Sequence, residues 1–269
     1  MRRLARGADD GFHCGLVPGL RSSADAMRLA EEFAFAAARL TALAQEPPGL
    51  YAEVAGWEGD LEERTWLAFL IAYLGPLEAE DPFAAVRHAR TPWASAEQPV
   101  LDGVQTGVRS AHDPRRGTRT LDAYRAWARR GGSQAAAFTG EPEWSPERRF
   151  ARTFERLALP GFHRDARFEL LVSLGRLGVY ELRAGTLQFG GDNPVTIAAK
   201  RALGIGDALL LERRAAELAE ACGLPLEAVD VGLYNWGRGE RATLGLRPEA
   251  DPDPRALAEA RAALGLSRA

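Results

Sequence analysis

Two carboxylates and a few cations in the last third of the chain are the side chains best suited to chemistry. Asp207 directly follows the segment Leu203-Gly204-Ile205-Gly206, and Asp230 lies 24 residues after Gly206. Three cations flank the glycines: Lys200, Arg213 and Arg214. A carboxylate can accept a proton from a nucleophile, and cations stabilise an anionic leaving group. These residue types suit a transfer reaction in which an anion departs.

The two glycines suggest how a substrate is held. Gly204 and Gly206 interrupt an apolar helical pattern, and glycine adopts a positive φ at little steric cost. The following helix begins with unpaired N–H groups at its positive dipole end, which predicts a small anion-binding concavity. Ile205 is expected to point inward and lock the helices together. We interpret the pattern as a helix-hairpin-helix element that holds a nucleic-acid phosphate; the alternative is an ordinary turn with Gly204 as the C-cap.

Each charged candidate also has a structural interpretation. Asp230 lies among apolar residues that would raise its pKa toward that of a useful base, or it lies on the exposed face of a core helix. Asp207 is a reactive carboxylate or a cap that complements the helix dipole. Arg213 and Arg214 stabilise a leaving group or belong to a solvated helix face.

Three further candidates have two interpretations each. Asn235 and Trp236 end a helical pattern, and an aromatic ring beside an amide suits the binding of a flipped base. The alternative is that Trp236 is a plug in the core. Lys200 is the only lysine of the chain. Either it marks a site that needs a compact ammonium group, or it has survived by chance.

The elements that must position these residues are helical. Apolar periodicity predicts helices over residues 23–45, 60–74, 81–90, 120–130 and 253–264, with Asp60 and Glu63 at capping-box spacing. Asp192-Asn193-Pro194 starts the helix that leads to Gly204. Two charged helices flank the break Leu159-Pro160-Gly161-Phe162, which we interpret as a structural helical hairpin. Residues 94–118 are the least regular stretch and form either a mobile loop or a substrate-contacting one.

One segment has the pattern of strands. Val179–Leu182 and Thr186–Phe189 alternate in polarity around a turn, which predicts one short β-hairpin. The predicted fold is therefore mainly α, a helical bundle with this hairpin. We expect an N-terminal tail (1–22), an N-terminal helical lobe (23–140), a helix-hairpin-helix-like lobe (141–247), and a linker with a C-terminal helix (248–269).

Charge is uneven along the chain. The net charge is −3, but residues 105–165 hold twelve arginines against seven acids. These arginines either solvate several helices or form a stripe that faces phosphate. The overall charge argues against a protein that coats nucleic acid.

The composition of the chain excludes several classes of protein. With 269 residues and 46% hydrophobic content the chain can bury a substantial core, and no apolar run is long enough for a membrane span or secretory signal, so we expect a cytoplasmic protein. Cys14 and Cys222 are too few for a disulfide framework, and Cys222 is expected to serve packing. The four histidines lack metal-ligand spacing, so no metal or other cofactor is identified; a divalent metal is left open.

The last third of the chain resembles a known group of enzymes. The helix after Gly206, followed by Asp230, resembles the core of the helix-hairpin-helix DNA glycosylases, although no lysine occupies the first turn of that helix as in members with lyase activity. The segments AAKRALGIGD, LLERRAAELAEACG and VGLYNWGRG more closely resemble the related alpha-glutamyl/putrescinyl thymine pyrophosphorylases of clade 3. This resemblance covers residues 150–239.

The resemblance implies a DNA base-modifying enzyme. Such an enzyme would displace pyrophosphate from a 5-hydroxymethyluracil-derived base in DNA with an amine or amino acid, such as putrescine or glutamate. Its partners would be DNA and that small co-substrate, without a membrane. Two alternatives remain: a monofunctional DNA glycosylase that uses Asp230 to support water attack, and a non-catalytic module that binds DNA through Gly204 and Gly206.

Overall fold

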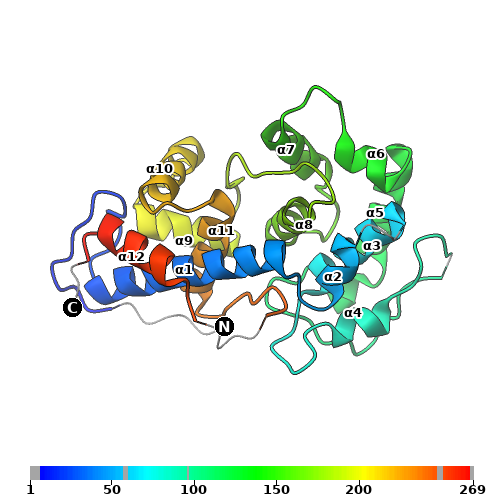
Figure 1. Cartoon of the computed structure of the whole chain (residues 1–269), viewed down its shortest axis with the longest axis horizontal. Helices are drawn as coiled ribbons and strands as arrows, with labels where there is room; N and C mark the ends of the chain where they lie inside the picture. The colour runs from blue at the N-terminus through cyan, green and yellow to red at the C-terminus, as the bar shows by residue number, and fades with distance from the viewer. Residues whose placement is uncertain (1–6, 57–59, 96, 247–250, 267–269) are drawn as a thin grey trace. The chain divides into compact units, whose positions relative to one another are not determined.

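The computed structural model describes residues 7–56, 60–95, 97–246 and 251–266, and these residues are mainly helical (Figure 1). They form twelve α-helices and one short 3₁₀ helix, which confirms the predicted all-α class. The chain divides into two compact units. Unit 1 comprises Met1–Thr41, Thr186–Ala242 and Glu249–Ala269, and unit 2 comprises Ala42–Gly185 and Thr243–Pro248.

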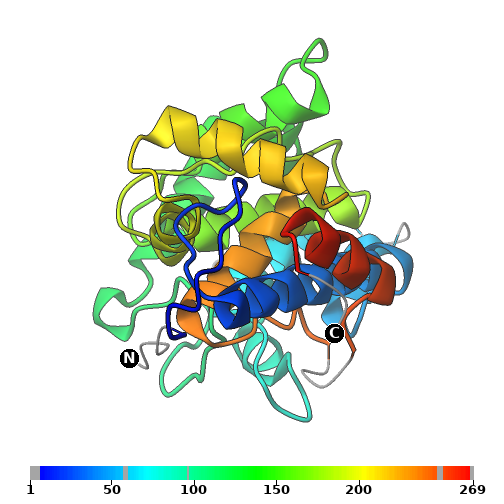
Figure 2. The same cartoon turned by 90° about the vertical axis from the view of Figure 1, so that its left-hand side faces the viewer.

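Unit 1 joins the two ends of the chain to the predicted hairpin. Its helices are most of α1 (Ser23–Gln45), α9 (Pro194–Leu203), α10 (Ala208–Ala221), α11 (Leu226–Arg238) and α12 (Pro254–Ala263). The helix α11 packs against both α9 and α10, while α12 lies beside α1 in both views (Figures 1 and 2). Gly232 permits a close approach, because a Cβ there would lie 2.4 Å from the Phe33 ring.

Unit 2 is built around one buried helix. Its elements are α2 (Leu50–Ala55), α3 (Leu61–Leu74), α4 (Ala84–Ala89), η1 (Pro114–Arg116), α5 (Arg119–Arg130), α6 (Gln134–Thr139), α7 (Pro146–Arg156) and α8 (Arg164–Arg176). Every residue of α3 from Arg64 to Leu74 is buried, and α8 packs along it. Trp66, Phe69 and Tyr124 stack beside one another in this core.

The helix starts follow local capping chemistry. Asn193 and Asp253 accept hydrogen bonds from the first turns of α9 and α12, as the sequence predicts. Asp60 caps α3 by accepting from the amide of Glu62. The capping box itself is incomplete, because Glu63 accepts a hydrogen bond from the amide of Trp93 instead of turning back to the cap.

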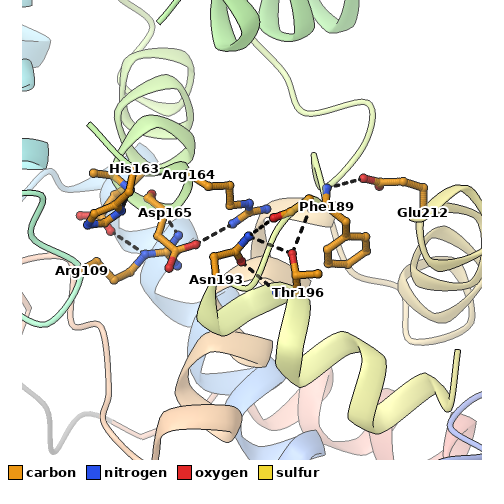
Figure 3. Close-up of polar contacts among 11 residues, drawn as sticks. Arg109, His163, Arg164, Asp165, Phe189, Asn193, Thr196 and Glu212 are labelled. Carbon is orange, nitrogen blue, oxygen red and sulfur yellow. Dashed lines mark hydrogen bonds and ion pairs between the residues drawn. The ribbon is translucent and has the colours of Figure 1, made fainter. Parts of the chain in front are cut away.

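The predicted β-hairpin is not formed. No described residue lies in a strand, and the two arms belong to different units. The Glu212 carboxylate of α10 accepts hydrogen bonds of 2.7 Å from the amides of Leu187 and Phe189, which a β-ladder between the two arms would need. Figure 3 shows the bond between Phe189 and Glu212. Gln188 between them has a φ of 54°, outside the strand region. A long-range carboxylate therefore replaces the partner strand.

Three further expectations concern single features. Cys222 is buried, and burial raises the pKa of its thiol to about 12, which keeps it protonated and suited to packing. Within the described ranges, no helix combines the length and apolar composition needed to cross a membrane. Residues 1–6 of the predicted tail and residues 248–250 of the predicted linker lie outside the described residues.

Candidate functional site

The predicted hairpin connects two helices in unit 1. The helix α9 ends at Leu203, and Gly204 follows it in the left-handed conformation, with φ 66° and ψ 22°. Its amide donates to the carbonyl of Lys200 at 3.0 Å. The helix α10 begins at Ala208, and the Asp207 carboxylate caps it through a 2.9 Å bond from the Leu210 amide. Gly204 thus has the C-cap geometry, and Asp207 has the N-cap geometry.

A row of backbone donors lies between these caps. The amides of residues 205–209 donate no hydrogen bond to any residue that the structure describes. Gly206 and the next three residues are exposed, whereas Ile205 is half-buried. Leu209 is 82% exposed and lies in the same turn. The hairpin therefore presents consecutive N–H groups beside an exposed apolar side chain.

The segment before α1 holds this hairpin in place. The Gly19 amide donates to the carbonyl of Ala202 at 3.0 Å. A Cβ at Gly19 would lie 2.0 Å from the carbonyl oxygen of Arg201 and 2.9 Å from the Gly204 nitrogen, so only glycine fits. The end of α9 is therefore supported by tertiary packing as well as by its own cap.

The three predicted cations differ in their surroundings. Lys200 is half-buried on α9 and forms no ion pair with a described residue. Arg213 and Arg214 both interact with Glu217, at 3.5 and 2.7 Å; Arg213 is exposed and Arg214 is half-buried. Charge on this face of α10 is therefore partly neutralised.

Asp230, Asn235 and Trp236 lie together on α11 but are buried. Asp230 has no exposed surface, which excludes the alternative of a solvent-exposed carboxylate. The Asn235 side chain donates to Glu32 at 3.2 Å and accepts from the Ala242 amide at 2.9 Å. The Trp236 indole donates to the carbonyl of Asp25 at 3.0 Å. These contacts give Asn235 and Trp236 structural roles; that they bind a base remains a prediction.

Unit 2 contains a pocket that the sequence did not single out. It has a volume of about 600 Å³ and lies between the loop Ser110–Arg116 and the turn Leu159–His163. The loop belongs to the irregular stretch 94–118, and the turn contains the predicted break at Pro160-Gly161. Three residues supply its aromatic and imidazole groups: His112, Phe162 and His163.

The two histidines of this pocket have different hydrogen-bond partners. His163 caps α8, and its Nε2 lies 2.8 Å from the carbonyl of Ser110. His112 Nδ1 lies 2.9 Å from the Tyr73 hydroxyl, while its Nε2 is buried without a hydrogen-bond partner among the described residues. Burial lowers the pKa of His112 below its usual 6.5, although the charge of Asp113 opposes this shift, so burial favours the neutral form of the ring.

A buried ion-pair network supports the pocket loop. Arg109 lies just before the loop and forms a 3.1 Å ion pair with Glu169 of α8, with both side chains at most 5% exposed. Its Nη2 also donates to the carbonyl of Asp165 at 3.2 Å, and the Asp165 carboxylate accepts from Arg164 at 3.2 Å (Figure 3). These contacts fix the loop to the first turns of α8.

The basic middle of the chain divides into buried and exposed arginines. Four of its twelve arginines are buried: Arg109, Arg125, Arg149 and Arg164. On α7 the exposed residues Arg148, Arg152 and Arg156 follow one another at four-residue spacing, which places them on one helix face. Arg148 and Arg156 both lie over the Trp144 ring. Structural and surface roles are thus both present.

Among the described residues, no group of three or more His, Cys, Asp or Glu side chains is arranged to hold a metal ion.

Comparison with known proteins finds no matching family model, no matching curated protein and no matching solved structure. A function must therefore be argued from the residues of the chain itself.

Proposed function

We propose that the protein binds DNA through the hairpin between α9 and α10 and modifies a thymine-type base, displacing pyrophosphate with an amine. One observation carries the DNA-binding half of this proposal: the amides of residues 205–209 donate to no described residue and lie at an exposed helix start. Such a start attracts anions through its N–H groups and its dipole. The Asp207 cap uses the Leu210 amide and leaves the preceding amides available.

Two neighbouring side chains favour nucleic acid as the anion. Lys200, one turn before Gly204, has no acidic partner among the described residues and can neutralise a second phosphate. Leu209 is the most exposed large apolar side chain that the structure describes. An exposed apolar group beside donors indicates a contact surface. Together these features fit a sugar-phosphate backbone better than a small inorganic anion.

The proposed chemistry is supported by the resemblance of residues 150–239 to the thymine pyrophosphorylases. The amine nitrogen would attack the methylene carbon on C5 of the base, and the bond from that carbon to the pyrophosphate oxygen would break. Pyrophosphate leaves with the electron pair, and a carboxylate accepts the proton released by the amine. Asp230 is the proposed acceptor, and Lys200, Arg213 and Arg214 are the proposed leaving-group stabilisers.

Ala208→Pro tests the role of the amides. Proline is favoured at the first helical position, and Asp207 before it already has an extended ψ of 129°, so we expect no loss of stability. The substitution removes one N–H that has no hydrogen-bond partner in the described part of the chain. We expect the affinity for duplex DNA to fall about tenfold, which corresponds to one hydrogen bond to a charged acceptor. Fluorescence anisotropy would measure this affinity.

The controls separate amide contacts from charge. Ala208→Ser keeps the amide and is expected to bind like the wild type. Ala208→Pro leaves the salt dependence of binding unchanged, whereas Lys200→Gln lowers its slope by about 0.9, the value for one phosphate contact. Unchanged affinity in a folded Ala208→Pro protein would contradict binding through this hairpin.

The chemical half of the proposal needs a product assay. Wild type and Asp230→Asn would be incubated with DNA that carries 5-hydroxymethyluracil, its pyrophosphorylated form or uracil, with and without putrescine and glutamate. We expect an amine adduct and free pyrophosphate by mass spectrometry, lost in Asp230→Asn. Asp207→Ser, which keeps an N-cap, tests Asp207 separately. Abasic sites would instead identify a glycosylase, and DNA binding without any product would identify a binding module.

A further inference from the structure

A second pocket of unit 2, the α5–α7 pocket, is lined by parts of α5, α6 and α7. It has a volume of about 370 Å³ and is lined by Trp127, Arg130, Gly131, Ala137 and Arg156. Trp127 is 6% exposed, and a Cβ at Gly131 would lie 2.8 Å from that of Ala137, so these walls are closely packed. No acidic side chain that the structure describes lines the pocket. Its charged groups are therefore two guanidinium groups from different helices.

A tryptophan holds one of these arginines and a neighbour in position. The guanidinium carbons of Arg156 and Arg148 lie over the Trp144 ring, 5.1 and 5.8 Å from its centroid. The ring itself packs against the end of α6, because a Cβ at Gly140 would lie 2.5 Å from it. An arginine that stacks on a ring uses the face of its guanidinium group and keeps its edge N–H groups for an acceptor. Trp144 therefore restricts both side chains before a ligand binds, which lowers the entropy lost on binding.

The positive charge of this surface is not neutralised by ion pairs. Arg130, Arg148 and Arg156 are exposed and form no ion pair with a described residue. The two carboxylates of α7 already have other arginine partners, which are Arg183 for Glu147 and Arg152 for Glu155. The whole chain has a net charge of −3, so this group of available guanidinium groups is a local feature.

The spacing of the arginines on α7 suits an extended anion. Arg148, Arg152 and Arg156 are four residues apart, and a rise of about 1.5 Å per residue separates the first from the last by about 12 Å along the helix. Arg156 also lines the α5–α7 pocket, where it meets Arg130. One small anion can contact only part of this row. A polymer that carries a phosphate on every unit can contact all of it.

The surface lacks the apolar groups that a protein or membrane partner would use. The exposed large apolar side chains of the described residues all lie elsewhere, at Val100, Ile197, Leu209 and Leu210. Protein–protein interfaces have an apolar centre, and helices that lie on membranes insert apolar side chains. Interfaces with nucleic acid are instead polar and positively charged.

We infer that α7 and the α5–α7 pocket form a second nucleic-acid surface, on unit 2, that binds the phosphate backbone. Arg130 and Arg156 hold one phosphate at the pocket, and Arg148 contacts another along α7. Because these contacts go to phosphates, binding here does not depend on base sequence. The choice of DNA as the nucleic acid rests on the proposed function, whereas the surface shares no residue with the hairpin of unit 1.

The salt dependence of DNA binding would test this inference with the full chain. Fluorescence anisotropy with duplex DNA at several salt concentrations gives the slope of log affinity against log salt. We expect Arg148→Gln and Arg156→Gln each to lower this slope by about 0.9, and the double variant to lower it by about 1.8. Arg156→Lys keeps the charge and should keep the slope. Arg115→Gln is the matched control, because it removes the same charge from an exposed arginine of unit 2 that is paired with Asp113; its slope should equal that of the wild type.

Further arms identify the partner and separate the two surfaces. Circular dichroism would confirm that the double variant is folded, and a second DNA sequence of equal length should give the same changes in slope. An unchanged slope in the folded double variant would overturn the inference. So would a double variant that loses affinity for phosphatidylserine vesicles or polyglutamate and keeps its slope with DNA. Ala208→Pro acts on affinity without changing the slope, so a failure of the hairpin and a failure of this surface give different results.

Discussion

Arg109→Met is expected to destabilise unit 2 by about 3–5 kcal/mol, because it leaves the Glu169 carboxylate charged and buried without its guanidinium partner. Both side chains of this pair are at most 5% exposed, so water cannot replace the lost interaction. The same substitution removes the bond from Arg109 to the Asp165 carbonyl. The loop that begins at Ser110 would then be attached to the start of α8 only through the contact between the Ser110 carbonyl and His163.

Chemical denaturation followed by circular dichroism would measure this loss. Arg213→Met is the matched control, because Arg213 is 67% exposed and its pair with Glu217 should contribute little. In the double variant Arg109→Met with Glu169→Leu, much of the stability should return, since neither charge is then buried alone. A single variant as stable as the control would show that the pair does not support the fold.

Helices were predictable because their signals are local. The helix predicted over residues 23–45 matches α1, and those over 60–74, 120–130 and 253–264 match α3, α5 and α12 to within a residue or two. Caps such as Asn193 and Asp253 lie next to the turns they stabilise. The fold class follows from such signals. The helix-hairpin-helix glycosylase-like arrangement of the helices, the four-segment division and the base-modifying activity stay predictions.

The errors arose where distant residues decide local structure. The alternation in Val179–Phe189 is typical of strands, but Glu212, more than twenty residues later, takes the amides that a ladder would use. No pattern around residue 187 indicates this carboxylate. The predicted capping box is incomplete for the same reason, since the Glu63 carboxylate accepts a hydrogen bond from the amide of Trp93, thirty residues away. Local preference is overridden when a tertiary partner satisfies the same group.

The pocket of unit 2 was missed for a related reason. His112 and His163 are 51 residues apart, and Tyr73 precedes His112 by 39, so neither spacing resembles a motif. The histidines have no metal-ligand spacing in the sequence, and His112 is held by a tyrosine that is distant in the chain. The available signal was weaker: an irregular stretch, 94–118, which the sequence predicts to be either a mobile loop or a substrate-contacting one.

Trp236→Ala is expected to destabilise unit 1 by about 3–5 kcal/mol, the usual cost of removing a large aromatic side chain from a core. Trp236 is 2% exposed, its indole donates to the Asp25 carbonyl, and the Arg201 guanidinium lies 4.5 Å above its ring. Trp236→Phe keeps most of the ring and loses the hydrogen bond, so a smaller loss of about 1–3 kcal/mol is expected.

These two variants also separate the two interpretations of Trp236. A plug affects DNA binding only through folding, so Trp236→Phe should bind DNA like the wild type at a temperature where it is folded. A ring that stacks on a flipped base would contribute to affinity directly, and replacing it would weaken binding in the folded protein. Trp144→Ala is the matched control, because Trp144 is only half-buried and its removal should change thermal stability little. Since the Trp236 ring is enclosed on both its polar edge and its face, the plug is the expected outcome, and any base would have to bind elsewhere in the molecule.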